Sequence, residues 1–241
     1  MTLDRQLLKS ALPKCACKAV RASDIQHRDD KEHGWRFAED EDDWRKATKT
    51  AVEGHSIGGV SDLTNPVHPS GTPAHVAYYL AVDDVDRGTE AAVEHGAQVV
   101  VAPFDAGEQG RPATLTDPAG AAFSLWQANH FTGWEFPLHL AGAPHRTVLA
   151  CEQPEEARQL YRRVTGSPPA CADFVAAGVS DATAPQWELL VAVEDVPGVL
   201  VRARRHGQEA GTWSDGAGRT ISRITSPEGL TVQVRDISVR T

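Results

Sequence analysis

Two ionisable side chains lie at or near the start of stretches that have the pattern of β-strands. His145 opens the stretch HRTVLAC at 145–151, and Glu188 lies near the start of WELLVAVEDV at 187–196. An imidazole and a carboxylate that meet in a binding site can take a proton from a bound phenol or carbon acid and return it. We therefore predict that His145 and Glu188 carry the chemistry of this protein.

The overall composition restricts the partners of such a site. The chain has 241 residues, 41% of them hydrophobic, and a formal net charge of -9. An acidic balance disfavours binding to nucleic acid or to an anionic membrane surface. No apolar run approaches the ~18 residues that span a bilayer, and the first residues do not resemble a signal peptide. We expect a cytoplasmic monomer or homodimer whose partner is a small molecule, with no nucleic acid and no membrane.

An internal repeat shows which elements would position the two residues. LAVDDV at 80–85 returns as VAVEDV at 191–196, an offset of 111. The dipeptide His-Gly at 95–96 returns at the same offset, and DPAG at 117–120 returns as SPEG at 226–229. The matches occur in the same order, and the offset between the copies changes only in polar segments. This pattern indicates a duplication.

Each copy is predicted to form a βαβββ unit. In the first copy, alternation and caps predict a strand at 75–82, a helix at 86–95 and strands at 97–103, 111–117 and 121–127. The second copy repeats this with strands at 187–193, 220–225 and 230–236 around a helix at 196–206.

Two further units complete the expected organisation. A strand at 145–151, a helix at 154–166 and a candidate strand at 173–180 begin one of them, and the other must lie within 1–63, before a linker at 64–73. We expect an α+β fold of four tandem βαβββ units in two domains, 1–133 and 134–241.

This pattern resembles a known superfamily. Three segments are similar to tandem glyoxalase-like members of the vicinal oxygen chelate superfamily: YYLAVDDVD, GRPATLTDPAGAAFSLWQANHFTG and the helix start E-x-P-x-x-A-x-x-x-Y. This superfamily includes glyoxalases, bleomycin-resistance proteins and dioxygenases. The resemblance implies that paired units curl their sheets around a cleft, with helices on the outer face. Strand alternation then predicts the cleft-facing residues: His75, Ala77, Tyr79, Ser124 and Trp126 in the first domain, and Glu188, Leu190, Thr231 and Gln233 in the second.

The resemblance also bears on metal binding. Metal-using members take ligands from the first and fourth strands of a unit, typically His and Glu, which suit divalent transition metals. In the first domain those positions hold Ala77 and Ser124, which do not form a ligand set. In the second domain they hold His145, Glu188 and Gln233. We expect no cofactor, and a divalent metal held by these three residues is the alternative.

Three functions are consistent with this superfamily, because a fold does not fix a function. The first is a cofactor-free enzyme that tailors a hydrophobic or aromatic metabolite, for example by hydroxylation, cyclisation or rearrangement. The second is a binding protein that sequesters a compound, as bleomycin-resistance members do. The third is a metal-dependent lyase, isomerase or dioxygenase. Inward ionisable groups such as His145 and Glu188 favour the enzyme.

Overall fold

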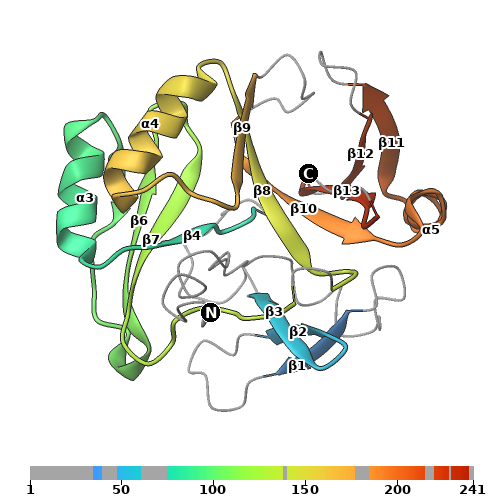
Figure 1. Ribbon diagram of the computed structural model, residues 1–241, viewed down its shortest axis with the longest axis horizontal. Helices are drawn as coiled ribbons and strands as arrows, with labels where there is room; N and C mark the ends of the chain where they lie inside the picture. Colours follow the sequence, from blue (N-terminus) through green and yellow to red (C-terminus); the bar gives the residue numbers. More distant parts are fainter. Residues whose placement is uncertain are drawn as a thin grey trace, which may run out of the picture.

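The computed structural model describes residues 35–39, 48–60, 75–137, 140–176, 185–214, 220–227 and 229–238, which form three sheets (Figure 1). The smallest sheet is an antiparallel meander of strands β1 (Arg36–Glu39), β2 (Thr48–Val52) and β3 (His55–Val60). These three strands lie within residues 1–63, where the first unit was expected. The predicted linker at 64–73 and everything before residue 35 lie outside the described residues.

The second sheet is a complete βαβββ unit. It contains β4 (Tyr79–Ala81), helix α3 (Val85–Glu94), β5 (Gln98–Val101), β6 (Gly110–Thr116) and β7 (Ala122–Ala128), in the order β4-β7-β6-β5. A short 3₁₀ turn, η1 (Gly107–Gln109), precedes β6. Helix α3 begins where the side chain of Asp84 accepts a hydrogen bond from the backbone N–H of Arg87.

The third sheet has six strands and combines the last two parts of the chain. It contains β8 (Pro144–Cys151), β9 (Ala172–Ala176), β10 (Trp187–Val193), β11 (Glu209–Ser214), β12 (Thr220–Thr225) and β13 (Thr231–Asp236), in the order β11-β12-β13-β10-β8-β9. Helix α4 (Pro154–Thr165) connects β8 to β9, and helix α5 (Val196–Arg205) follows β10. The mixed α+β fold is therefore confirmed.

Equivalent positions confirm that 75–128 and 186–236 are copies of one unit. The parallel pair β10 and β13 repeats the pair β4 and β7, since Leu190 lies beside Gln233 as Tyr79 lies beside Ser124. Asp195 caps α5 through the N–H of Gly198, as Asp84 caps α3. The turns before β7 and β13 each place a glycine at positive φ, +100° at residue 120 and +87° at residue 229.

The elements differ from the prediction in three places. The strand predicted at 75–82 pairs only over Tyr79–Ala81, because Val76 and Tyr78 turn into cores shared with the six-stranded sheet. Strand β11 was not predicted, since EAGTWS has little alternation. Between α4 and β10, the described residues form only β9, so a complete βαβββ unit is not seen there.

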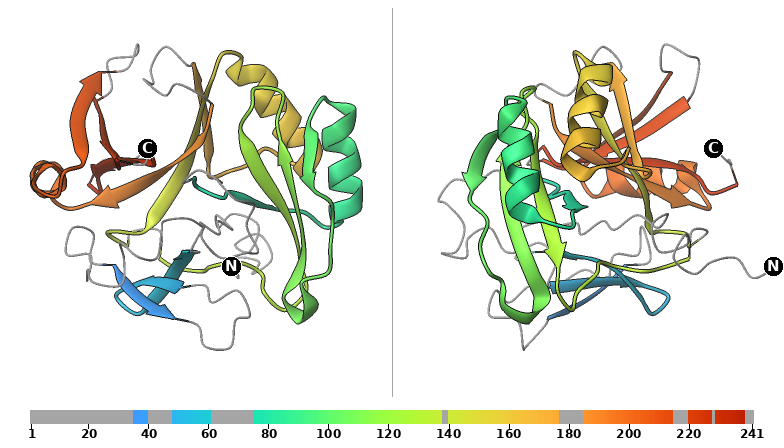
Figure 2. Two further views of the ribbon diagram at one scale, coloured as in Figure 1. Left: turned by 180° about the vertical axis from the view of Figure 1, so that it is seen from behind. Right: turned by 60° about the vertical axis from the view of Figure 1, so that its left-hand side comes forward.

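Helices α4 and α5 cover the same side of the six-stranded sheet (Figure 2). Leu189, Val191 and Val234 pack with α5 residues in one core. The largest core joins the first complete unit to α4, β8 and β9. Within it the Tyr78 and Trp187 rings lie 4.5 Å apart, centroid to centroid. This core crosses the predicted boundary at 133/134, so the division into two domains stays a prediction. No helix in the described ranges is long and apolar enough to span a membrane.

Candidate functional site

Strand register places a group of polar residues on the side of the six-stranded sheet that carries no helix. One row runs from Arg146 on β8 through Leu190 and Gln233 to Arg223 on β12. Side chains two residues away along each strand share this face. We call it the inner face and define it by the following residues: Arg146, Asp173, Glu188, Leu190, Trp213, Arg223, Thr231, Gln233 and Arg235.

Glu188 lies at the centre of a buried polar cluster on the inner face. Nε2 of Gln233 donates to Oε2 of Glu188 at 2.7 Å, and Nη2 of Arg223 lies 3.2 Å from the same oxygen. The exposed fractions of Glu188, Arg223 and Gln233 are 2%, 7% and 6%. Because buried charges are tolerated only when they are paired and hydrogen-bonded, the three side chains form one interdependent group.

Both contacts end on Oε2 of Glu188, and Oε1 takes part in neither. The guanidinium of Arg223 also lies over the Trp213 ring, 5.7 Å from its centroid. The cluster thus combines a carboxylate oxygen outside the ion pair, a guanidinium and an indole on neighbouring strands. Such a set can accept a proton, stabilise negative charge and contact a flat ring.

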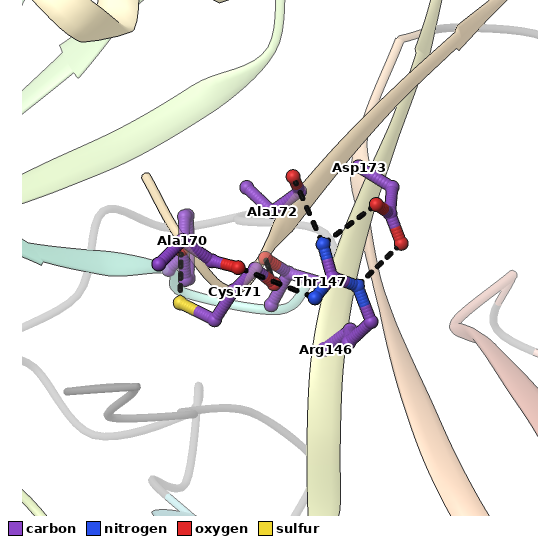
Figure 3. Close-up of polar contacts among 7 residues, drawn as sticks. Arg146, Thr147, Ala170, Cys171, Ala172 and Asp173 are labelled. Carbon is purple, nitrogen blue, oxygen red and sulfur yellow. Dashed lines mark hydrogen bonds and ion pairs between the residues drawn. The ribbon is translucent and has the colours of Figure 1, made fainter. Parts of the chain in front are cut away.

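A second ion pair lies closer to solvent on the same face (Figure 3). Arg146 donates from Nε and Nη2 to the two carboxylate oxygens of Asp173, at 2.6 and 2.7 Å, in a bidentate pair. Further bonds from Arg146 reach the carbonyl oxygens of Ala170 and Ala172. The hydrogen bond to Asp173 raises the pKa of Arg146 above its ordinary value.

Arg235 on β13 is the third guanidinium of the inner face. Its Nε is buried and has no hydrogen-bond partner among the described residues. Burial and the positive charge of Arg146 lower the pKa of Arg235, while Asp173 opposes this change. Arg235 is therefore a partly buried positive charge with no carboxylate of its own in the described part of the chain.

The structure brings together some of the residues predicted for the second domain. Glu188 and Gln233 are hydrogen-bonded, and Leu190 lies beside Gln233 in the strand ladder. Thr231 is buried, and its hydroxyl lies 3.2 Å from that of Thr225. These four residues share the inner face as alternation predicted.

His145 lies apart from the Glu188 cluster. Its Nε2 lies 3.1 Å from the carbonyl oxygen of Leu140, in the turn before β8. Glu188 pairs with Val148 across the ladder, and the register between β8 and β10 shifts near His145. The predicted pairing of imidazole and carboxylate is not found, since the polar partners of Glu188 in the described part of the chain are Gln233 and Arg223.

In the first unit, the residues predicted to line a pocket form neutral contacts. The Ser124 hydroxyl lies 2.9 Å from the Thr114 hydroxyl. The rings of Tyr79 and Trp126 meet edge to face with centroids 6.1 Å apart. His75 and Ala77 are half-buried and precede β4. No charged cluster like that of Glu188 occurs on the described strands of this unit.

The inner face does not fit a divalent metal. Both of its carboxylates are paired with guanidinium groups, Glu188 with Arg223 and Asp173 with Arg146, and a further cation there would be repelled. In the predicted alternative set, His145 lies against the carbonyl oxygen of Leu140, whereas Glu188 and Gln233 bond to each other. In the ranges that the structure describes, no group of three His, Cys, Asp or Glu side chains could hold a metal.

Sequence reasoning missed three of the residues that give the inner face its charge, namely Arg146, Arg223 and Arg235. The repeat contained the signal for Arg223. At an offset of 109 it corresponds to Thr114, which faces Ser124 as Arg223 faces Gln233. A guanidinium with an exposed fraction of 7% is costly to bury, so its position indicates a role beyond packing.

One sequence motif that was also missed does not mark a catalytic site. GHSIG at 54–58 has the G-x-S-x-G spacing of a nucleophile elbow, which requires a turn from a strand into a helix. Here the turn at Glu53 and Gly54 joins β2 to β3, and Ser56 lies within β3. The motif therefore lacks the required context.

Comparison with known proteins agrees with this architecture. A family model described as a glyoxalase-like domain matches residues 19–126. CFP32 of Mycobacterium bovis, which carries a glyoxylase name, is 35% identical over 115 residues that cover 48% of this chain and 43% of CFP32. The anthracycline biosynthesis protein DnrV of Streptomyces peucetius is 30% identical over 151 residues, covering 55% of this chain and 54% of DnrV. The chain thus spans about half the length of these relatives.

Solved structures extend the similarity across the whole fold. A Mn(II)-bound glyoxalase from Novosphingobium aromaticivorans aligns with a TM-score of 0.54 at 12% identity, covering 96% of this chain and 86% of that one. Homoprotocatechuate 2,3-dioxygenase from Brevibacterium fuscum aligns with a TM-score of 0.56 at 10% identity, covering 92% and 80%. Residues 19–126 thus match a glyoxalase-like domain, and the chain shares its fold with these glyoxalase and dioxygenase structures.

Proposed function

We propose that this protein is a cofactor-free tailoring enzyme that acts on a hydrophobic or aromatic small molecule at the inner face of the six-stranded sheet. The observation that carries the proposal is the buried cluster of Glu188, Arg223 and Gln233. Two relatives, DnrV and DauV, are named for anthracycline biosynthesis, which supports a role in modifying a natural product.

In this proposal Glu188 is the proton acceptor. Gln233 and Arg223 fix the carboxylate through Oε2, so that Oε1 can be presented to an acidic O–H or C–H group of the substrate. Removal of that proton leaves an oxyanion or enolate on the substrate. The adjacent guanidinium of Arg223 can stabilise this charge in a site with little water.

Arg223 also explains how the reaction proceeds without a cofactor. A positive charge that lowers the energy of an anionic intermediate is one service that a metal ion provides in enzymes. A fixed guanidinium beside Glu188 supplies a positive charge in the same part of the sheet. His145 is a second candidate for proton transfer, separate from this cluster.

The proposal is tested by product formation. The purified protein, treated with EDTA and then desalted, is incubated with a panel of hydroxylated aromatic acids and anthracycline aglycones, and products are followed by mass spectrometry. We expect turnover that survives EDTA and falls about 100-fold or more in Glu188→Gln, since the amide keeps the shape and removes the base. Glu194→Gln, which changes an exposed carboxylate just after β10, is the matched control and should leave turnover unchanged.

Two results would overturn the enzyme assignment. Turnover that survives both Glu188→Gln and His145→Ala would make these residues structural. Turnover that EDTA abolishes and a divalent metal restores would show that the reaction depends on a metal.

The second candidate function is binding and sequestration of a small molecule. It is favoured by the low exposure of Glu188, 2%, and by the two protein groups that already occupy its Oε2. A sequestering protein would bind members of the same panel and return them unchanged. Calorimetric binding without any product, in the wild type as well as in Glu188→Gln, would select this function.

A further inference from the structure

The charges of the inner face do not balance. Asp173 is taken by the bidentate pair with Arg146, and Glu188 is taken by Arg223. Arg235 then remains without an ion-pair partner among the described residues, although its Nε is buried. A buried guanidinium nitrogen without a hydrogen-bond acceptor is costly, and an anion bound beside Arg235 would supply one.

Strand register sets Arg235 in a row with an aromatic side chain. Trp213 on β11 pairs with Ile221 on β12. The ladder between β12 and β13 pairs Ser222 with Val234, so the next step places Ile221 beside Arg235. Trp213 and Arg235 therefore lie on the same face, two strands apart, with an aliphatic side chain between them.

Arg146 lies on the same face as Arg235, on strand β8. Its row partner Leu190 is on β10, which neighbours the strand of Arg235. Burial is the main cause of the lowered pKa of Arg235, and the positive charge of Arg146 lowers it further. The half-buried side chains of Arg146 and Arg235 reach solvent, in contrast to the buried Glu188 cluster. A ligand could thus approach the two guanidinium groups from outside.

We propose that the inner face binds an anionic aromatic ligand, with its carboxylate or phenolate on Arg235, near Arg146, and its ring beside Trp213 and Ile221. This inference rests on the proposed function and specifies its substrate class as acidic aromatic compounds. A guanidinium fork suits a carboxylate, and an indole with a neighbouring aliphatic chain suits a flat ring. The arrangement places the ring on the same face as Glu188.

The test uses two probes of similar shape, the anionic 2-naphthoate and the neutral 2-naphthamide, with binding measured by isothermal titration calorimetry. We expect the wild type to bind the carboxylate at least about tenfold more tightly than the amide, as a charge-assisted hydrogen bond implies. Arg235→Gln should abolish this preference and leave naphthamide binding unchanged. Arg205→Gln, which removes an exposed arginine of α5, should leave both affinities unchanged.

A stability measurement separates ligand binding from a structural role. Since Arg235→Gln removes an unpartnered charge, its Tm without ligand should equal or exceed that of the wild type. Arg235→Lys keeps the charge and should retain part of the preference. A lowered Tm with an unchanged preference, or a wild type without any preference, would overturn the proposal.

The two proposals fail in different ways. If the wild type shows no preference for naphthoate while Glu188→Gln still abolishes turnover, the anion site is wrong and the proposed function stands. If the preference depends on Arg235 but Glu188→Gln leaves turnover intact, the anion site stands and the proposed function is wrong.

Discussion

The two complete βαβββ units share one scaffold and differ in the chemistry of one face. In the first unit, Thr114 and Ser124 form a neutral hydroxyl pair on neighbouring strands. At an offset of 109, the second unit has Arg223 and Gln233, which both contact Glu188. The strand order and the helix caps are the same in both.

The same comparison continues along the face. Trp126 of the first unit corresponds to Arg235 of the second, and Ala77 corresponds to Glu188 at an offset of 111. Since the first unit folds with neutral residues at these positions, the scaffold does not require the charges. Burial of charged groups is costly, so their presence in one copy supports the proposal that this face serves a ligand.

The largest expected effect comes from removing one member of the charged cluster. Glu188→Ala leaves the guanidinium of Arg223 buried without its carboxylate, which should lower the free energy of unfolding by about 3–5 kcal/mol. Ser124→Ala, at the position of the first unit that matches Gln233, breaks only a neutral bond and should cost about 0.5–1.5 kcal/mol. Urea denaturation measures both.

A double variant sharpens this test. Glu188→Leu combined with Arg223→Met replaces both charges and should recover most of the stability that Glu188→Ala loses. If Glu188→Ala proves no more destabilising than Ser124→Ala, the ion pair contributes nothing to the fold, and the contrast between the units is only one of function.

The second prediction concerns the turn before the last strand of each unit. In the first unit, Asp117 accepts a hydrogen bond of 2.9 Å from the hydroxyl of Tyr161 on α4, and both side chains are buried. Tyr161→Phe leaves a buried carboxylate oxygen without this donor and should cost about 1–3 kcal/mol. The second unit has Ser226 at the equivalent place, bonded only to the local N–H of Leu230 at 3.2 Å.

Ser226→Ala is the matched comparison and should cost less than Tyr161→Phe in the same denaturation experiment. Equal losses would mean that the link from the turn to α4 adds no stability beyond the turn itself.

The sequence predicts the secondary-structure elements of this protein better than it predicts the contacts between their side chains. The strands, helices and turns of both complete units were predictable, because caps such as Asp84 and Asp195 and glycines at positive φ mark their ends directly. Strand alternation also placed Glu188 and Gln233 on one face. These signals are local, so a single sequence contains them.

The charged partners depended on strand order, which no local signal gives. Arg223 meets Glu188 only because β12 lies beside β13, and β13 beside β10. His145 shows the same limit. Its strand was predicted correctly, but Glu188 pairs with Val148, three residues further along β8, and cross-strand pairing of this kind has no local sequence signature.

The third prediction concerns pH. Burial raises the pKa of Asp117 above its ordinary value of 3.8. A raised folded-state pKa means that this group favours folding below its unfolded pKa and that the contribution is lost as the pH rises through the folded value. The side chain in Asp117→Asn does not titrate. The stability of this variant relative to the wild type should therefore increase as the pH rises from about 3 through the raised pKa of Asp117. Parallel stability profiles for the two proteins would show that Asp117 does not contribute.

The smallest effects are expected at the two helix caps, where the units are alike. Asp84 and Asp195 each accept a bond from the N–H three residues later, at 3.0 and 2.9 Å. Asp84→Ala and Asp195→Ala should therefore each lower the free energy of unfolding by about 1 kcal/mol, and by similar amounts. Because neither cap touches the inner face, both variants should bind 2-naphthoate as the wild type does. A loss of ligand affinity in Asp195→Ala alone would show that α5 takes part in positioning the inner face, and that the two units differ in more than the residues on one side of their sheets.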